Sequence, residues 1–393
     1  MYVRRLRLEN VGTFRRAELL LNLPGEPSKG RALPNVTVLV GAGGAGKTTA
    51  LRAVAIAALS ASTRGAVVVP ARELIRREGG RSKRARIRAD VSTDAHDVSL
   101  AIALRPGDRD QLLARASGRL GVSSSTPSPF VVGYGANRLV RQTARSTRDV
   151  STTAVARIAT LFDDDASLLH LHSWLPRLRA HDRARCTEAV ALLRSPGVAR
   201  AELLSDLVDG ELRFRDGDTA HPFDALSAGQ RAHIGWIGDL LFHAIAHLSA
   251  SARLSEARGL VLVDQIDLHL HPDAQREVVP TIARALPELQ FVITTHSPIV
   301  VGSVSRSNVR RVEASSDGAT IVASSREVFG LSAEQLLAGD HFAVASTRNT
   351  VFDRHLQRET NAARGGDPEA ALRVLRLLTL GGAAIEDATA RSR

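Results

Sequence analysis

The sequence predicts an α/β fold with a mixed central sheet, a lobe of helices and a phosphate-binding turn. Three observations carry this prediction. Short apolar runs rich in β-branched residues alternate with helical stretches, a glycine-rich turn stands between one such run and a helix, and polar motifs follow the later runs directly. Runs that are apolar throughout are typical of strands buried on both faces of a sheet.

The composition is that of a globular protein. Of 393 residues, 44% are apolar and 24% charged, which excludes a disordered, collagen-like or disulfide-stapled chain. No uncharged apolar run reaches the length of about 18 residues that a transmembrane helix needs, so we expect no membrane contact. Cys186 is the single cysteine, and we expect a cytoplasmic protein. The net charge of +11 favours an anionic partner such as nucleic acid.

The predicted elements follow from periodicity and turn residues. Strands are expected in 1–22 (two strands), 36–40, 85–92, 97–104, 130–135, 260–263 and 291–294. Helices are expected in 48–60, 150–208 (mainly helical), 230–248, 273–287 and the last 50 residues. The chain is thereby predicted to comprise an N-terminal lobe (1–138), a helical lobe (139–229), a C-terminal lobe (230–345) and a helical tail (346–393).

A glycine-rich turn follows the strand at 36–40. The motif G-x-x-x-x-G-K-[ST] is matched without a gap by Gly41, Ala42, Gly43, Gly44, Ala45, Gly46, Lys47 and Thr48. Glycines allow consecutive backbone N–H groups to face one concavity that holds phosphates, and the following helix adds its N-terminal dipole. Lys47 is expected to reach the β- and γ-phosphates, and the Thr48 hydroxyl is expected to bind Mg²⁺. Lys47 is one of only three lysines in the chain, which argues against a chance match.

Three further motifs stand at element ends. Asp264 ends the apolar run 259–263 and is the expected partner of the glycine-rich turn on the Mg²⁺ side. The residues Ser227, Ala228, Gly229 and Gln230 precede a long predicted helix, where Ser227 is also an ordinary N-cap residue. His296 follows the strand at 291–294. The order of these four motifs along the chain is more specific than any one of them.

Together these motifs resemble the ABC-type ATPases of the SMC, RecF and OLD group. The opening strand at 6–15 and the run 266–272 after Asp264 also resemble that group, and the segments 130–138, 161–175 and 330–342 resemble compact bacterial defence ATPases of the Septu type. The resemblance covers roughly residues 1–350. It implies ATP and Mg²⁺ as ligands, with Thr49 and Arg15 added to the nucleotide-binding set.

The resemblance also implies a homodimer or higher homo-oligomer whose heads enclose ATP. The turn formed by Ser227 to Gln230 then meets the γ-phosphate of ATP bound to the other subunit, and His296 acts as the switch histidine. One position departs from the pattern, because Gln265 stands where the group has a catalytic glutamate. Glutamine holds a hydrogen bond but cannot act as a base, so we expect binding with reduced hydrolysis. Both a naturally inactive site and a deliberate Glu→Gln substitution explain Gln265.

A basic segment is the candidate DNA contact. It spans residues 72–88, and its proposed contact residues are Arg76, Arg77, Arg81, Lys83, Arg84 and Arg86. A solvated loop with balancing acidic residues is the alternative. No nuclease constellation is visible, so a separate nuclease or effector subunit is expected. A metal site among Asp267, His269, His271 and Asp273 is disfavoured by the resemblance.

The predicted function is an ATP-dependently dimerising ATPase that regulates a DNA-directed effector in anti-phage defence. The alternatives are a RecF-like repair ATPase that binds DNA directly and a non-hydrolysing ATP-sensing scaffold. An ABC transporter motor is disfavoured by the opening strand and by the run Leu268 to Pro272.

Overall fold

The computed structural model describes most of the chain in two compact units, Met1–Leu336 and Leu337–Arg393. The described residues are 1–27, 33–62, 66–78, 81–82, 84–93, 97–106, 111–117, 130–140, 153–198, 202–203, 212–216, 218–342, 344, 346 and 348–380. Within them, no helix is long and apolar enough to cross a membrane.

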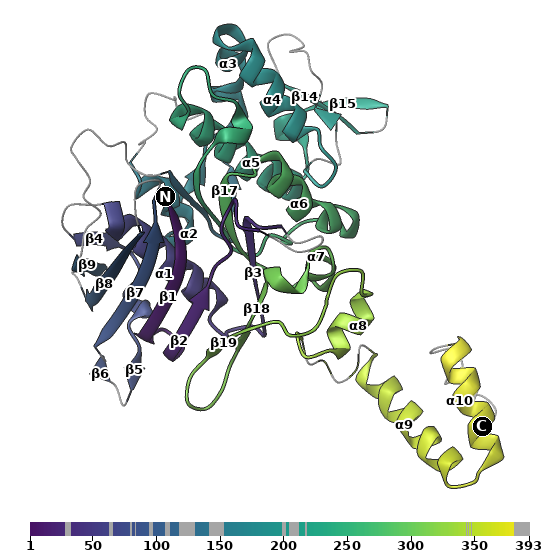
Figure 1. Ribbon diagram of the computed structural model, residues 1–393. Coiled ribbons are helices and arrows are strands. Elements are labelled where there is room, and N and C mark those ends of the chain that lie inside the picture. Colours follow the sequence, from purple (N-terminus) through teal and green to yellow (C-terminus); the bar gives the residue numbers. More distant parts are fainter. Residues whose placement is uncertain are drawn as a thin grey trace. The chain divides into compact units, whose positions relative to one another are not determined.

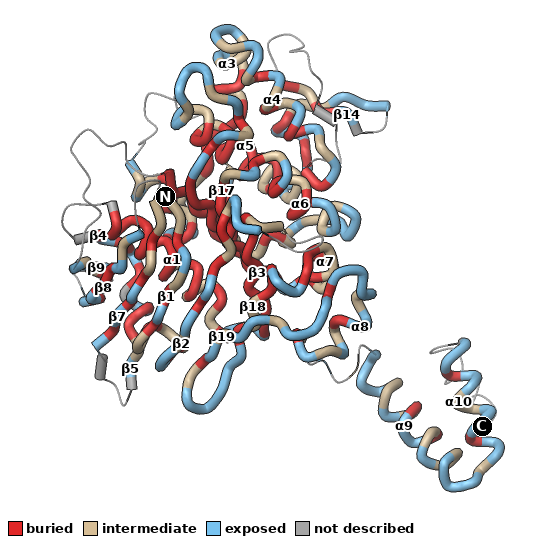
Figure 2. Tube along the Cα trace, in the orientation of Figure 1, coloured by how far each residue is buried: buried red, intermediate tan, exposed pale blue. Residues whose placement is uncertain are grey.

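A six-stranded sheet, mostly parallel, forms the centre of the first unit (Figure 1). Its strand order is β10 (Val131–Tyr134), β16 (Gly259–Val263), β17 (Leu289–Thr294), β3 (Val36–Val40), β18 (Val309–Glu313) and β19 (Thr320–Ala323). Only β18 and β19 pair antiparallel. Every residue of β3, β16 and β17 is buried, as Figure 2 shows for β3 and β17. The apolar runs in the sequence therefore predicted these strands correctly.

A second six-stranded sheet is fully antiparallel. Its order is β2 (Phe14–Leu20), β1 (Tyr2–Val11), β7 (Ala85–Ser92), β8 (Asp97–Pro106), β9 (Leu112–Ser117) and β4 (Ala66–Val69). Buried and exposed residues alternate along β7 and β8, so one face packs inward and the other meets solvent. A small hairpin, β5 (Arg77–Glu78) with β6 (Arg81–Ser82), precedes β7.

The helix α1 (Lys47–Ser62) joins the two sheets. It contacts strands of both, and its residues 50–59 form one core cluster with inward side chains of β1, β7 and β16, apart from the half-buried Arg52. Six of its sixteen residues are alanine, which lets two sheets approach the helix closely. The mixed sheet with helices confirms the predicted α/β P-loop fold.

The segment predicted as the helical lobe contains both helices and strands. Its helices are α2 (Ala159–Phe162), α3 (Leu175–His181) and α4 (Arg183–Leu193), and α5 (Ala228–His247) follows it. Its strands are β11 (Leu139–Val140), β12 (Ser167–Leu168), β13 (Glu202–Leu203), β14 (Arg213–Asp216) and β15 (Thr219–Pro222). The prediction of a mainly helical 150–208 holds for the described residues of that range, where only the two-residue strands β12 and β13 accompany the helices.

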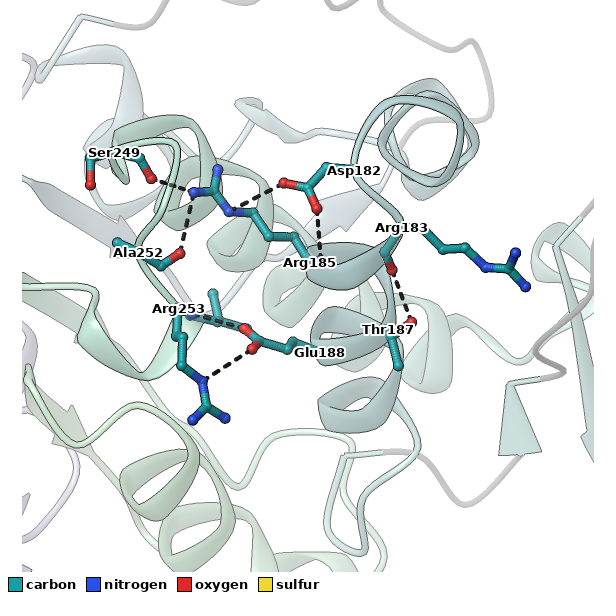
Figure 3. A network of polar contacts seen from close by, with 9 residues as sticks. Asp182, Arg183, Arg185, Thr187, Glu188, Ser249, Ala252 and Arg253 are labelled. Atoms are coloured by element: carbon teal, nitrogen blue, oxygen red, sulfur yellow. Dashed lines mark hydrogen bonds and ion pairs between the residues drawn. The ribbon is translucent and has the colours of Figure 1, made fainter.

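Polar contacts fix α4 against the segment that follows α5 (Figure 3). Arg185 donates hydrogen bonds to the carbonyl oxygens of Ser249 and Ala252. Glu188 accepts the backbone N–H of Leu254 at 2.8 Å. These contacts tie α4 to residues 249–254, just beyond the C-terminal end of α5.

The remaining helices complete the two units. They are α6 (Pro272–Ala285), α7 (Pro298–Gly302), α8 (Ala333–Ala338), α9 (Thr350–Arg364) and α10 (Pro368–Leu380). In the second unit α9 and α10 pack against each other, and Arg373 of α10 forms an ion pair of 2.7 Å with Glu359 of α9. The predicted helical tail thus holds to residue 380, and residues 381–393 lie outside the described part.

Candidate nucleotide site

The polar motifs meet at one edge of the parallel sheet. The strands β3, β16 and β17 run side by side in the same direction, with Val263 opposite Ile293 and Thr294 opposite Leu39. Their carboxyl ends therefore lie together, which is where open α/β sheets hold ligands. The glycine-rich turn, Asp264 and the segment before His296 each leave one of these ends.

The glycine-rich turn curves around the ammonium group of Lys47. The Nζ atom donates to the carbonyl oxygens of Gly41 at 2.8 Å and Ala42 at 2.9 Å. A Cβ on Gly46, at φ +113°, would lie 2.2 Å from the Thr13 hydroxyl, so glycine is required there. Ala42, Gly43 and Gly44 face solvent. Burial lowers the pKa of Lys47, and its positive charge lies next to this open rim.

Two oxygen groups from distant parts of the chain meet below the turn. The Thr48 hydroxyl donates to Asp264 Oδ2 at 2.8 Å, and the Thr294 hydroxyl donates to Oδ1 of the same carboxylate at 2.5 Å. Mg²⁺ prefers such oxygen ligands and usually combines one or two carboxylates with substrate phosphates and water. The Thr48–Asp264 pair therefore fits a Mg²⁺ ion bound together with a nucleotide.

Gln265 is held in an unusual backbone conformation. Its φ is +48°, which lies in the left-handed region that residues other than glycine rarely adopt. Its N–H donates to the Thr294 hydroxyl at 2.8 Å, and its carbonyl oxygen accepts from Arg138 at 2.8 Å. These two bonds fix the peptide, so the carboxamide projects from a rigid point next to Asp264.

His296 is exposed at the same edge. Its backbone N–H donates to Asp267 at 3.3 Å. Partial burial and the nearby charge of Lys47 lower the pKa of its imidazole, so the ring is neutral near pH 7. A neutral ring offers one donor and one acceptor.

Arg138 lies four residues after β10, and the sequence allows it either to join a second basic cluster or to support the nucleotide site. Its side chain is buried, and Nη2 donates to the carbonyl oxygens of Asp264 at 2.6 Å and Gln265 at 2.8 Å. Its guanidinium lies 5.5 Å from the ring centroid of Trp236 on α5. Burial lowers its pKa to about 10, so Arg138 stays charged. It links the Asp264 loop to the helix that begins at the serine turn.

The serine turn opens α5. Ser227 caps the helix by accepting the N–H of Gln230 at 3.2 Å, and Gln230 Oε1 accepts the N–H of Ser227 at 3.0 Å. This reciprocal pair is a capping box. Ser227 and Ala228 are exposed, and Gly229 lies against His269, where a Cβ would approach within 2.9 Å.

The structure places the other predicted residues as follows. Thr49 packs on Gly12, where a Cβ would lie 2.6 Å from its methyl group. Arg15 is exposed and forms an ion pair with Asp317 at 3.6 Å. Among the described residues, no group of three or more His, Cys, Asp or Glu side chains could hold a metal ion; the cluster at 267–273 is thus not a site of that kind.

The described arginine side chains of the predicted basic segment differ in exposure. Arg76 is half-buried and donates to the carbonyl oxygen of Thr13 at 2.8 Å, which makes it a structural tie. Arg77, Arg84 and Arg86 are exposed. Lys83 lies outside the described residues, and for Arg81 the structure describes the backbone in β6 only.

Comparison with known proteins shows what this chain is similar to. The model of the family described as "AAA domain, putative AbiEii toxin, Type IV TA system" matches residues 159–302. The Septu protein PtuA of Bacillus mycoides (strain KBAB4) is 28% identical over 240 residues, which cover 60% of this chain and 32% of that protein. The Retron Ec83 probable ATPase of Escherichia coli is 33% identical over 84 residues, covering 21% of this chain and 16% of that one.

The chain thus aligns with about a third of the first relative and less of the second. Among solved structures, the SMC head bound to the C-winged helix domain of ScpA matches with a TM-score of 0.49 at 16% identity. That match covers 82% of this chain and 97% of the other.

Proposed function

We propose that this chain, an ABC-type ATPase of the SMC-like group related to the ATPases of Septu and retron defence systems, binds ATP between two copies of itself and thereby controls a DNA-directed effector. The effector is a separate subunit, most simply a nuclease, and the setting is anti-phage defence. The observation that carries the proposal is the hydrogen bond between Thr48 and Asp264, which are 216 residues apart.

The residues at the sheet edge have distinct roles in this proposal. The backbone N–H groups of the glycine-rich turn and Lys47 bind the phosphates, and Thr48 with Asp264 holds Mg²⁺. The ion neutralises charge on the transferred phosphoryl group. His296 contacts the γ-phosphate as a neutral hydrogen-bonding group. Gln265 orients the attacking water without taking its proton.

The exposed serine turn supports binding across two copies. Ser227 and Ala228 face solvent at the N-terminus of a 20-residue helix. A helix N-terminus attracts an anion through its free N–H groups and its dipole. We propose that this terminus of one copy closes over the γ-phosphate bound by its partner.

The native mass of the protein with and without Mg²⁺–ATP tests this arrangement. We expect ATP to double the mass, Lys47→Ala to abolish ATP binding, and Ser227→Arg to retain ATP binding but stay monomeric. Ser332 provides a matched control, because it forms the same capping box with Gln335 before α8. Ser332→Arg should dimerise normally. Dimerisation of Ser227→Arg at wild-type ATP concentrations would overturn the proposed closure.

A second candidate rests on Gln265 alone. A side chain that cannot act as a base favours an ATP-sensing scaffold whose closure is long-lived. Co-expression of this protein with the product of the neighbouring gene tests the RecF-like alternative. A protein that controls an effector should purify with a second chain, whereas a RecF-like ATPase should purify alone.

A further inference from the structure

A groove lined by arginines crosses the outer face of the antiparallel sheet. Its floor is formed by Ala101 and Ala103 of β8, and its volume is about 490 Å³. Four arginines line it, and they come from β7, β8 and β9: Arg86, Arg88, Arg105 and Arg115. All four are exposed. The two alanines of β8 thus lie between arginines of β7 and β9. This arrangement follows from the pairing of the three strands.

The register of the strands sets the two walls. Arg86 stands opposite Ala103, and Ala103 stands opposite Arg115 on the far side. Arg88 stands opposite Ala101 in the next row. Because neighbouring strands lie about 4.8 Å apart, the β7 and β9 walls are separated by about 10 Å. Residues on one face of a strand repeat every ~6.7 Å, which is the spacing of Arg86 and Arg88 along β7. β9 contributes Arg115 alone, and Arg105 lies on β8 in line with the two alanines.

The charge of this groove is not balanced by the described residues. No ion pair or hydrogen bond joins the side chains of its four arginines to any part of the chain that the structure describes. The adjoining surface over β1 and β2 differs, because Glu18 forms an ion pair of 2.9 Å with Arg7 there. Arg7 also stands directly opposite Arg88, and like charges in that position destabilise a sheet. Glu9, by contrast, stands opposite Arg86, so Arg86 has one acidic cross-strand neighbour and Arg88 has none.

We propose that this groove binds the phosphodiester backbone of a nucleic acid. Guanidinium groups recognise phosphate oxygens with two parallel hydrogen bonds. The ~6.7 Å spacing of Arg86 and Arg88 along β7 is about twice the 3.4 Å rise per nucleotide of a DNA strand. A backbone lying over the alanine floor is thus reached from both walls. Arg86 and Arg88 belong to the basic segment predicted from the sequence, whereas Arg105 and Arg115 lie outside it.

Fluorescence anisotropy with a labelled DNA duplex of about 30 base pairs, in salt between about 50 and 200 mM, tests the groove. Four phosphate contacts predict a slope of log K against log salt of about −3.6. The double variant Arg88→Glu, Arg115→Glu should weaken binding at least about tenfold and reduce the slope by about 2. A single strand of equal length distinguishes the source of the backbone, and the tighter of the two identifies it.

The control is a matched pair of exposed arginines on α6, Arg276 and Arg284, which line a different pocket. Arg276→Glu, Arg284→Glu makes the same change in net charge and should leave DNA affinity within about twofold. Equal weakening by both pairs, or no weakening by the groove pair, would overturn the proposal. The neutral variant Arg88→Gln, Arg115→Gln guards against misfolding and should show an intermediate loss.

ATP binding separates this proposal from the proposed function. The groove variants should bind ATP as the wild-type protein does, and Lys47→Ala should bind DNA as before in the absence of ATP. A groove variant that lost DNA affinity only together with ATP binding would contradict a separate site.

Discussion

The two six-stranded sheets of this protein differ in how their faces are buried. In the mostly parallel sheet, the strands β3, β16 and β17 are buried on both faces along their whole length. The antiparallel sheet is buried on one face only, so β7 alternates buried residues with Arg86 and Arg88. Residues of the buried parallel strands can therefore contact a ligand only where these strands end. The antiparallel sheet can contact a ligand over its whole exposed face.

This difference explains where the candidate sites lie. Thr48, Asp264 and Thr294 meet at the carboxyl edge of the parallel strands, within hydrogen-bonding distance. The arginines of the groove are spread over three antiparallel strands. One sheet supports a compact site for a small anionic ligand, and the other presents a broad surface suited to a polymer.

The largest expected effect tests this contrast directly. Val261→Asp would bury a carboxylate in the parallel sheet, and we expect it to destabilise the first unit by at least about 4 kcal/mol or to prevent folding. Ala103→Asp on the outer face of β8 should cost no more than about 1 kcal/mol. Thermal and urea unfolding measure both. Comparable losses at the two positions would mean that the faces are not different in burial.

The same contrast sets what the sequence could predict. Strands buried on both faces are apolar runs, so residues 36–40, 260–263 and 291–294 were predicted to within two residues. The strands β7 and β8 could also be predicted from the sequence, as could the motifs at the strand ends. Each of these signals is local, since a few consecutive residues contain it.

Features that depend on distant partners were not predictable. β18 contains Val-Arg-Arg-Val-Glu, which has little strand signal, and it becomes a strand because it pairs with β3. Arg138 binds carbonyl oxygens that lie 126 and 127 residues away. The groove required the register of β7, β8 and β9, and the basic residues nearest in sequence, such as Arg76, turned out to be tied to the backbone.

The next largest expected effect is on the rate of ATP hydrolysis. Gln265→Glu would supply a base at the edge of the parallel sheet, and general base catalysis contributes about 10²- to 10⁴-fold. We expect kcat for ATP to rise by that amount while ATP affinity changes little. A steady-state phosphate-release assay measures it, with Lys47→Ala as the background control. Unchanged turnover would favour the scaffold over the enzyme.

Stability at acidic pH depends on a buried histidine near the parallel sheet. His233 of α5 accepts from Trp236 and donates to the carbonyl oxygen of Gly197 at 3.0 Å, and burial lowers its pKa to about 3. Below its ordinary pKa of 6.5, the unfolded chain binds a proton that the folded chain does not, so stability falls with pH. Between pH 7 and 5 this costs about 2 kcal/mol.

Urea unfolding at the two pH values measures that cost. Because other groups titrate in the same range, the informative quantity is the difference from His233→Gln, which keeps one donor and one acceptor. We expect the variant to lose about 2 kcal/mol less than the wild-type protein on acidification. Parallel pH curves for the two proteins would rule out His233 as the source.

The smallest effect concerns the link between the sheet edge and α5. Arg138→Met removes the donor to the carbonyl oxygens of Asp264 and Gln265, and we expect kcat in a Gln265→Glu background to fall about tenfold with little change in KM. Arg157 is the matched control. It is also buried, donates to the Val131 carbonyl oxygen at 3.1 Å, and lies over the Phe130 ring.

Both substitutions leave a buried carbonyl oxygen without this donor, so both should destabilise the protein by about 1–3 kcal/mol. Only Arg138→Met should reduce kcat, because only Arg138 holds the peptide that precedes the catalytic position. An equal fall in kcat for the two variants would show that Arg138 acts through general packing. The loss of a contact at the edge of the parallel sheet would then reduce kcat no more than the loss of a contact within β10.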